Sequence, residues 1–365
     1  MRWKFWKKDN EEKPKKRKSV AREWTDAILF AVIAASIIRW GVLQLFTIPT
    51  ASMENSLLVG DFLFVSKMHY GPITPKTPLQ VPLTHQKVPF FNVKSYLDWI
   101  ELPQYRLPGF THIKRNDVVV FNYPEEFQHP TDLKTNYIKR CIGAPGDTLE
   151  VRDTQVYING EKGINPPEME YSYYVKTRNA VNPRVFKKCN IWDYVTTNDG
   201  YYVIGATPES AKKLANYPFI DEVILDKSKS DEIEANTYPK SDLFEWNKDF
   251  YGPVTIPAEG MTIELTEENV AMYIHVIEHF EGYEKVVLKE GKLIVDGEAI
   301  SEYTFKQNYY FMMGDNRHNS LDSRYWGFVP EDHVVGKALF VLISLDQHES
   351  FPDKIRWNRI FMGIK

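Results

Sequence analysis

Ser52 is the first residue whose position suggests chemistry. It follows a long apolar segment and lies in the run Ile48-Pro-Thr-Ala-Ser-Met53. A serine hydroxyl is a weak nucleophile until a neighbouring base takes its proton. Histidine is the usual base, but no G-x-S-x-G pattern surrounds Ser52, and none of the nine histidines lies in a nucleophile-elbow motif. A different type of base therefore has to be considered.

Lysine can act as the base when burial favours its neutral form. Lys139 lies in Tyr137-Ile-Lys-Arg-Cys-Ile-Gly143, an apolar segment typical of a strand. Because side chains alternate along a strand, Lys139 is expected on the face opposite Ile138 and Arg140. The same position also suits an edge-strand lysine that discourages aggregation. This segment alone leaves both interpretations open.

A third segment concentrates charged and small polar residues between apolar flanks. It runs Met313-Gly-Asp-Asn-Arg-His-Asn-Ser-Leu-Asp-Ser-Arg324, and the apolar stretch 325–330 follows it. Such a density of polar groups is unusual for a solvated loop. By contrast, His275 and His279 lie four residues apart on a predicted helix without a third ligand, so we interpret them as surface residues and expect no metal site.

In this order after an apolar amino-terminal segment, the three motifs resemble type I signal peptidases, the Ser/Lys leader peptidases of bacteria. The resemblance covers Ile48 to about Tyr70, Lys114 to Gly160, and Tyr310 nearly to the end. It implies a mainly β, signal-peptidase-like catalytic domain. It also implies a membrane-anchored serine endopeptidase that cleaves signal peptides from exported preproteins after small residues at −1 and −3, with no cofactor.

The resemblance implies a role for each matching residue. Ser52 would be the nucleophile and Lys139 the general base, with Ser320 holding the lysine amine. Thr50, where the family has serine, would complete an oxyanion hole with the Ser52 backbone N–H. The ion-pair framework that stiffens the site would consist of Arg140, Asp322 and Arg324. The pockets for the −1 and −3 side chains would be lined by Ile48, Met53, Leu57, Val120, Tyr137 and Ile138.

The sequence departs from the family pattern in three places. Asn55-Ser56 replaces the usual Pro-Thr after the nucleophile, and Arg115-Asn-Asp117 replaces Arg-Gly-Asp before a valine-rich strand. His318 replaces the more usual acidic residue. None of these residues is expected to transfer a proton, so we expect the departures to affect pocket shape and not the reaction.

The element that must place Ser52 is the apolar segment before it. Between Ala27 and Ile48 the only polar residues are Ser36, Arg39, Gln44 and Thr47. As a helix this segment spans about 30 Å, the thickness of a bilayer's hydrocarbon core. A cleaved signal peptide and a buried core helix are the alternatives. Arg39 lies just past the middle of this span, where a charge either snorkels to an interface or serves a function.

Charge gives the orientation of this segment. Residues 1–24 carry ten Lys/Arg and four Asp/Glu, and basic flanks stay on the cytoplasmic side. We therefore predict a basic cytoplasmic tail over 1–24 and one transmembrane helix over 25–48. The protein would be a single-pass protein of the cytoplasmic (inner) membrane, with the amino terminus cytoplasmic and the catalytic body on the periplasmic or extracytoplasmic side.

The remaining chain is predicted to be mainly β. Asn159-Gly160 and Asp296-Gly297 indicate tight hairpin turns, and a soluble helix is expected to begin at Thr266. The apolar clusters 88–91 and 96–100 are expected to pack beneath their loop and not to lie on lipid. The predicted domains are a catalytic first part over 49–160 with a proline-rich insertion over 72–113, an inserted domain over 161–305, and a catalytic second part over 306–365.

Composition excludes several classes of protein. The 365 residues are 43% hydrophobic and 14% aromatic with a net charge of −4, which excludes a disordered chain. Cys141 and Cys189 are the only cysteines, too few for a disulfide scaffold or a Cys-based zinc site, and we expect no bridge between them. The expected partners are preprotein signal peptides, the lipid bilayer and the secretion machinery, with no nucleic acid. A Ser/His hydrolase and a membrane-tethered scaffold, or inactive homologue, are the alternative functions.

Overall fold

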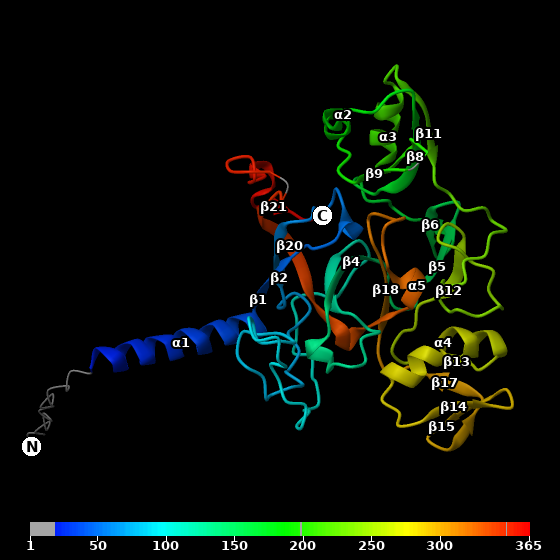
Figure 1. Ribbon diagram of the computed structural model, residues 1–365. Helices are drawn as coiled ribbons and strands as arrows, with labels where there is room; N and C mark the ends of the chain where they lie inside the picture. Colours follow the sequence, from blue (N-terminus) through cyan, green and yellow to red (C-terminus); the bar gives the residue numbers. More distant parts are fainter. Residues whose placement is uncertain (1–18, 198, 348) are drawn as a thin grey trace, which may run out of the picture.

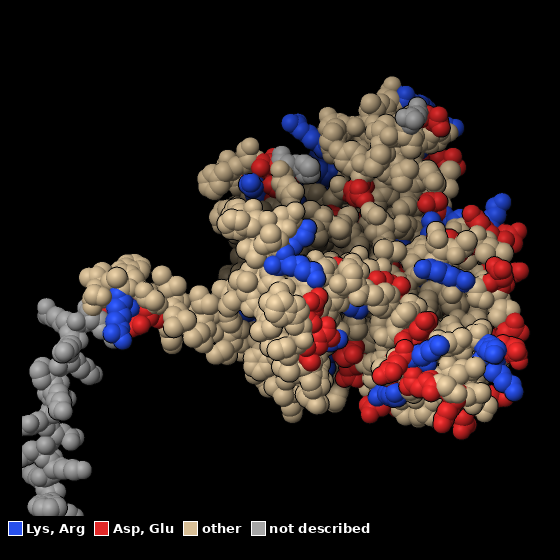
Figure 2. Space-filling model, turned by 60° about the horizontal axis from the view of Figure 1, so that its bottom comes forward, with Lys and Arg blue, Asp and Glu red and all other residues tan. Residues whose placement is uncertain are grey.

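A computed structural model describes residues 19–197, 199–347 and 349–365. Most of the predicted basic tail therefore lies outside the described residues. Helix α1 (Val20–Gly41) extends away from a body built mainly of strands (Figure 1), which confirms the predicted fold class. In Figure 2 most of the rod formed by α1 is tan, with charged side chains at its outer end. Its length and composition suit a membrane-spanning helix, with a mean hydropathy of 1.4.

The helix ends earlier than the sequence indicated. It stops at Gly41 and not at Ile48, because β1 (Leu43–Thr47) pairs antiparallel with β2 (Asp61–Ser66). Strand pairing satisfies the β1 backbone, and Phe46 packs against the core that β2 helps to form. Only Val42 separates α1 from β1. Arg39 consequently lies in the last turn of α1 and not near its middle.

An antiparallel sheet of eight strands forms the centre of the body. Its order is β1-β2-β20-β3-β4-β18-β19, with β21 pairing to β20. The further strands are β3 (Val118–Asn122), β4 (Asn136–Gly143), β18 (Tyr309–Met313), β19 (Val329–Pro330), β20 (Val334–Ser344) and β21 (Met362–Gly363). The three motifs that resemble signal peptidases thus meet on one sheet, since the serine segment joins β1 to β2, and β4 and β18 are neighbours.

One lobe of the body has a hydrophobic core of its own. It contains β8 (Tyr171–Thr177), β9 (Tyr194–Thr196), β10 (Tyr202–Ala206), β11 (Ile220–Leu225), α2 (Pro183–Lys188) and α3 (Pro208–Ala215). Its sheet has the order β11-β8-β10-β9, and Figure 1 shows this green lobe at one end of the molecule.

A second group of elements shares its core with β18 of the central sheet. They are β12 (Tyr251–Thr255), β13 (Thr262–Glu264), α4 (Glu267–Phe280), β14 (Val286–Lys289), β15 (Lys292–Val295), β16 (Glu298–Ile300) and β17 (Glu302–Thr304). They pack with β5 (Thr148–Arg152), β6 (Gln155–Ile158) and β18, and β7 (Glu161–Lys162) pairs with β6. Both predicted hairpins form, at Asn159-Gly160 and Asp296-Gly297. Thr266 caps α4 as predicted, accepting a hydrogen bond from the Asn269 N–H.

The proline-rich insertion 72–113 lies between β2 and β3, and its only strand pairing among the described residues consists of isolated bridges. Its aromatic side chains are mostly exposed, with Phe90, Phe91 and Trp99 at 104%, 73% and 80%. Tyr96 alone turns inward, where its hydroxyl hydrogen-bonds His129. The expectation that both apolar clusters pack beneath the loop is therefore wrong. An extended, proline-rich chain turns only some of its side chains inward.

Candidate active site

Ser52 lies in a single 3₁₀ turn, η1 (Ala51–Met53), between β1 and β2. The turn follows Pro49, whose ring fixes the backbone before it. Two backbone hydrogen bonds hold the preceding residue, from Ile48 N–H to Asp61 and from Gly60 N–H to Ile48. Ser52 is 9% exposed, so it lies at the margin of the core. Thr50 precedes the turn and makes no side-chain capping bond, which leaves its hydroxyl available.

Lys139 reaches the Ser52 hydroxyl from the middle of β4. Its Nζ lies 2.7 Å from Ser52 Oγ and 3.1 Å from the Ile138 carbonyl oxygen. The lysine is 4% exposed. Burial lowers the pKa of the Lys139 amine from 10.5 to about 8, against the opposing charges of Asp322 and Asp315. The amine can therefore lose its proton near neutral pH and accept one from the serine.

Two buried ion pairs surround the amine without neutralising it. Arg140 binds both carboxylate oxygens of Asp315, at 2.8 and 2.6 Å, and Arg324 binds both oxygens of Asp322, at 2.9 Å each. Because each carboxylate is held by an arginine, neither forms a salt bridge with Lys139. Bidentate pairs of this kind also fix side-chain geometry. No role was predicted for Asp315, although a buried arginine on β4 requires an acidic partner.

Gly314 brings the third motif against the serine turn. A Cβ at this position would lie 2.3 Å from Ser320 Oγ and 2.4 Å from the Ser52 carbonyl oxygen, so no larger residue fits. Asn316 adds two hydrogen bonds of 3.2 Å, from its N–H to the Ser52 carbonyl and from its side-chain amide to that of Ala51. Ser320 Oγ is buried and, among the described residues, makes no hydrogen bond to Lys139.

The residues expected to line the substrate pockets lie in two places. Ile48, Met53, Leu57 and Val120 share one buried cluster, against which Ile138 packs. Met53 and Leu57 are fully buried, so they form the floor beneath the serine turn. Tyr137 belongs to a neighbouring cluster and stacks on Tyr123, with ring centroids 4.4 Å apart.

A residue of the segment 161–305 also completes the site, and its role was not predicted from the sequence. Glu170 is fully buried, accepts a 2.6 Å hydrogen bond from Asn55 and pairs its backbone with Asp315 and Arg317. Burial raises the pKa of Glu170 to about 8, with a further contribution from Glu54. The signal that could have found this contact is the departure from the family pattern at Asn55.

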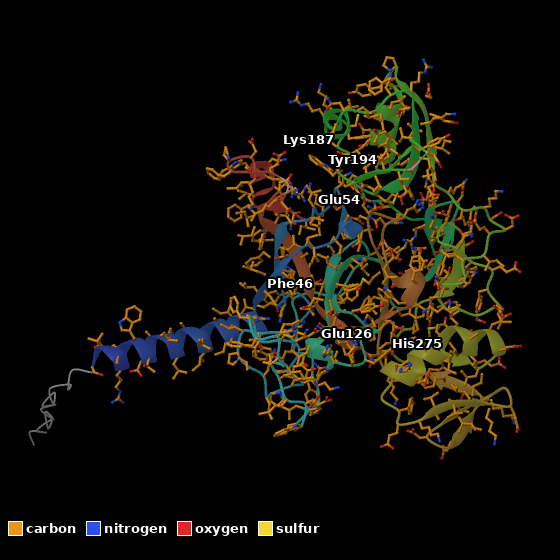
Figure 3. All side chains as sticks on the ribbon, viewed as in Figure 1. Phe46, Glu54, Glu126, Lys187, Tyr194 and His275 are labelled. Carbon is orange, nitrogen blue, oxygen red and sulfur yellow. The ribbon has the colours of Figure 1, made fainter. Side chains whose placement is uncertain are left out.

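The lobe that contains β8 to β11, α2 and α3 faces Glu54, which directly follows the serine turn. Figure 3 shows Glu54 facing the lobe that carries Lys187 and Tyr194. Burial and the nearby Asp193 carboxylate raise the pKa of Glu54 to about 7. This side of Ser52 therefore gains negative charge as the pH rises through neutrality.

The two other departures also have structural explanations. Asn116, where the family has glycine, adopts a φ of 71°, a left-handed conformation that asparagine tolerates better than most residues. His318 Nε2 lies 2.8 Å from Asp249, and His318 Nδ1 accepts a hydrogen bond from Ser172 N–H. Both ring nitrogens are thus occupied by residues of the segment 161–305, which leaves His318 unsuited to act as a base for Ser52.

The structure also places His275, which was considered as a metal ligand, and the two cysteines. His275 lies 2.7 Å from Glu125, on the α4 side of the molecule (Figure 3). Cys141 and Cys189 are both buried and free.

Comparison with known proteins identifies relatives along most of the chain. Residues 21–211 and 295–343 match the family model described as signal peptidase, peptidase S26. The chain is 30% identical over 337 residues to signal peptidase I of Buchnera aphidicola subsp. Acyrthosiphon pisum, covering 90% of this chain and 77% of the relative. It is 27% identical over 351 residues to the Haemophilus influenzae signal peptidase I, covering 95% and 77%, and 25% identical over 353 residues to that of Helicobacter pylori strain J99, covering 92% and 90%.

Proposed function

This chain belongs to the signal peptidase family, peptidase S26, and on that premise we propose that Ser52 and Lys139 form its catalytic dyad. Membership of the family makes the chain a serine endopeptidase of the signal peptidase I type. The observation that carries the dyad is the 2.7 Å contact between the buried Lys139 Nζ and Ser52 Oγ. A neutral amine at this distance can take the serine proton as the hydroxyl attacks a peptide carbonyl.

The proposed reaction has two steps. Ser52 Oγ bonds to the carbonyl carbon of the residue at −1, and Lys139 takes the hydroxyl proton. When the peptide C–N bond breaks, Lys139 returns that proton to the departing amine, which is the new amino terminus of the mature protein. Water, deprotonated by the same lysine, then hydrolyses the acyl-enzyme and releases the signal peptide. The Ser52 N–H and the Thr50 hydroxyl would stabilise the oxyanion in both steps.

Substrate selection would use the apolar surface around the serine. An extended peptide bound along the sheet presents alternate side chains to the same face, which matches a requirement at −1 and −3. Ile48, Met53 and Leu57 already fill the space beneath the turn. Because this floor is fully packed, small side chains such as alanine would be favoured at −1 and −3.

Helix α1 would anchor the enzyme in the cytoplasmic membrane with its amino terminus in the cytoplasm. The short connection from α1 through β1 to η1 supports this arrangement. It would place Ser52 close to the outer surface of the bilayer, where the end of a membrane-embedded signal peptide emerges.

The dyad can be tested by incubating detergent-solubilised full chain with a preprotein and sequencing the new amino terminus of the product. Ser52→Ala and Lys139→Ala should abolish cleavage, and Lys139→Arg should also be inactive because a guanidinium stays charged. Lys134→Ala is a matched control, since burial also lowers the pKa of Lys134 to about 8 and Lys134 has no role in the dyad. Cleavage by Lys139→Arg at the wild-type rate would refute the proposal, and an inactive wild-type protein would favour a scaffold.

A further inference from the structure

A pocket lies where the body end of α1 meets the insertion 72–113. Its volume is about 360 Å³. The last turns of α1 contribute Ser36, Arg39 and Trp40, Lys67 follows β2, and His85 comes from the insertion. Figure 1 shows the cyan insertion beside this end of the helix. The Trp40 indole N–H donates a 2.8 Å hydrogen bond to the Ile73 carbonyl, which fastens the insertion to α1.

The pocket holds two cationic side chains that are not paired with a carboxylate. Within the described part of the chain, neither the Arg39 guanidinium nor the Lys67 amine makes a hydrogen bond or salt bridge to another side chain. Burial, and repulsion from Arg39, lower the pKa of Lys67 to about 8. Two cations held together in a partly buried site favour an anionic ligand.

The carboxylate that lines the pocket is already committed. One oxygen of Asp132 accepts hydrogen bonds from the backbone N–H groups of Lys76 and Thr77, and the other accepts the Thr77 hydroxyl, each at 2.9 Å. Asp132 is therefore held by the insertion backbone, and it forms no ion pair with Arg39 or Lys67 among the described residues.

Two further polar atoms in the pocket have no partner. Ser36 Oγ and His85 Nε2 are buried and make no hydrogen bond within the described residues. Buried polar atoms are normally satisfied. Their location beside Arg39 and Lys67 would let a single ligand that accepts hydrogen bonds satisfy the whole group.

The position of the pocket indicates the source of such a ligand. Arg39 lies two residues before the end of α1, so with α1 in the bilayer it lies at the level of the lipid headgroups. Exposed aromatic side chains of the same insertion, Phe90, Phe91 and Trp99, fit the interfacial layer of a membrane. A phosphate at this level is part of a phospholipid.

We propose that this pocket binds the phosphate of a phospholipid headgroup, with Arg39 and Lys67 as its cationic contacts and Ser36 and His85 as further hydrogen-bonding groups. The proposal rests on the membrane insertion of α1 proposed above. Arginine and lysine are the residues that recognise phosphate most effectively. A bound lipid would connect the insertion to the helix and fix the body against the membrane surface.

The test is to titrate the purified full chain in a neutral detergent with phosphatidylglycerol and to count retained lipids by native mass spectrometry. We expect the wild type to retain one lipid tightly. Arg39→Gln/Lys67→Gln should bind it about tenfold or more weakly, because charged hydrogen bonds are lost. Lys67→Arg should retain binding because the charge is kept. Lys176→Gln, an exposed position on β8, is the control for net charge.

Equal lipid retention by the double variant and the wild type would overturn the proposal, as would an equal loss in Lys176→Gln. A parallel titration uses inorganic phosphate alone. Binding of inorganic phosphate as tight as that of the lipid would show that a free anion is the ligand and would also overturn the proposal. Cleavage of a soluble signal-peptide substrate is measured on the same samples. A failure of the lipid site is thereby distinguished from a failure of the dyad.

Discussion

Replacing Lys139 with methionine should separate the catalytic role of the amine from its cost to the fold. Burial lowers the pKa of Lys139 from 10.5 to about 8. At about 1.36 kcal/mol for each tenfold change, holding the charged amine in the native site costs about 3 kcal/mol at pH 6.5. Methionine has a similar shape without the charge, but it loses a hydrogen bond worth about 1 kcal/mol. Lys139→Met should therefore be inactive and about 2 kcal/mol more stable at pH 6.5.

The pH dependence gives the sign of the effect. Between pH 8 and 10.5 the unfolded chain holds a proton on Lys139 that the native chain has lost, so wild-type stability rises with pH. The cost of the lysine falls to about 1 kcal/mol at pH 9.5, and the advantage of Lys139→Met should disappear. Denaturant unfolding of the full chain in neutral detergent measures both values. A variant less stable than the wild type at pH 6.5 would show that the site does not disfavour the charged amine.

Cleavage should follow the fraction of neutral lysine. With a pKa of about 8, kcat/KM on a soluble signal-peptide substrate should be about a tenth of its plateau at pH 7 and about a hundredth at pH 6. The limb should rise with pH and have a slope of one. A rate that stays constant from pH 6 to 8 would refute the assignment of Lys139 as the base.

Substitutions of Thr50, Gly314 and His318 test the surroundings of the dyad. Thr50→Val should lower kcat about 100-fold or more by removing an oxyanion donor, whereas Thr50→Ser should be near wild type; equal rates for both would exclude Thr50. Gly314→Ala should lower kcat about 100-fold, because its Cβ would displace the serine turn. Gly363→Ala is the control and should have no effect, since its Cβ meets nothing within 4 Å. Matching rates in the two variants would contradict the proposed close contact at Gly314. His318→Ala should keep its cleavage rate but lose about 3 kcal/mol of unfolding free energy, because Asp249 loses its buried partner; a folded but inactive variant would favour a Ser/His hydrolase.

Local patterns predicted those elements whose structure depends on nearby residues. The Asn159-Gly160 turn has positive φ angles at both residues, which is the property from which the hairpin was predicted. Thr266 caps α4 through a bond to a residue three positions away. These features need no information from distant parts of the chain, so the sequence was sufficient.

Features that depend on contacts between residues far apart in the chain were harder to predict from the sequence. Hydrophobicity continues from Ala27 to Ile48, but the backbone changes from helix to strand because residues 61–66 offer a pairing edge. The role of Asp315 depends on its contact with Arg140, which lies 175 positions away. Glu170 lies outside the three segments whose motifs resemble signal peptidases, and only the fold brings it beside the serine turn. Composition and spacing give no direct access to such contacts.

The single residue between α1 and β1 makes a stiff joint. Val42 N–H bonds to Ile38 in the helix, and the Val42 carbonyl accepts a hydrogen bond from Lys67 at the end of β2. With α1 embedded as proposed, the height of Ser52 above the bilayer is set by covalent geometry and not by a flexible tether. The enzyme would therefore select a scissile bond by its distance from the membrane as well as by the side chains beside it.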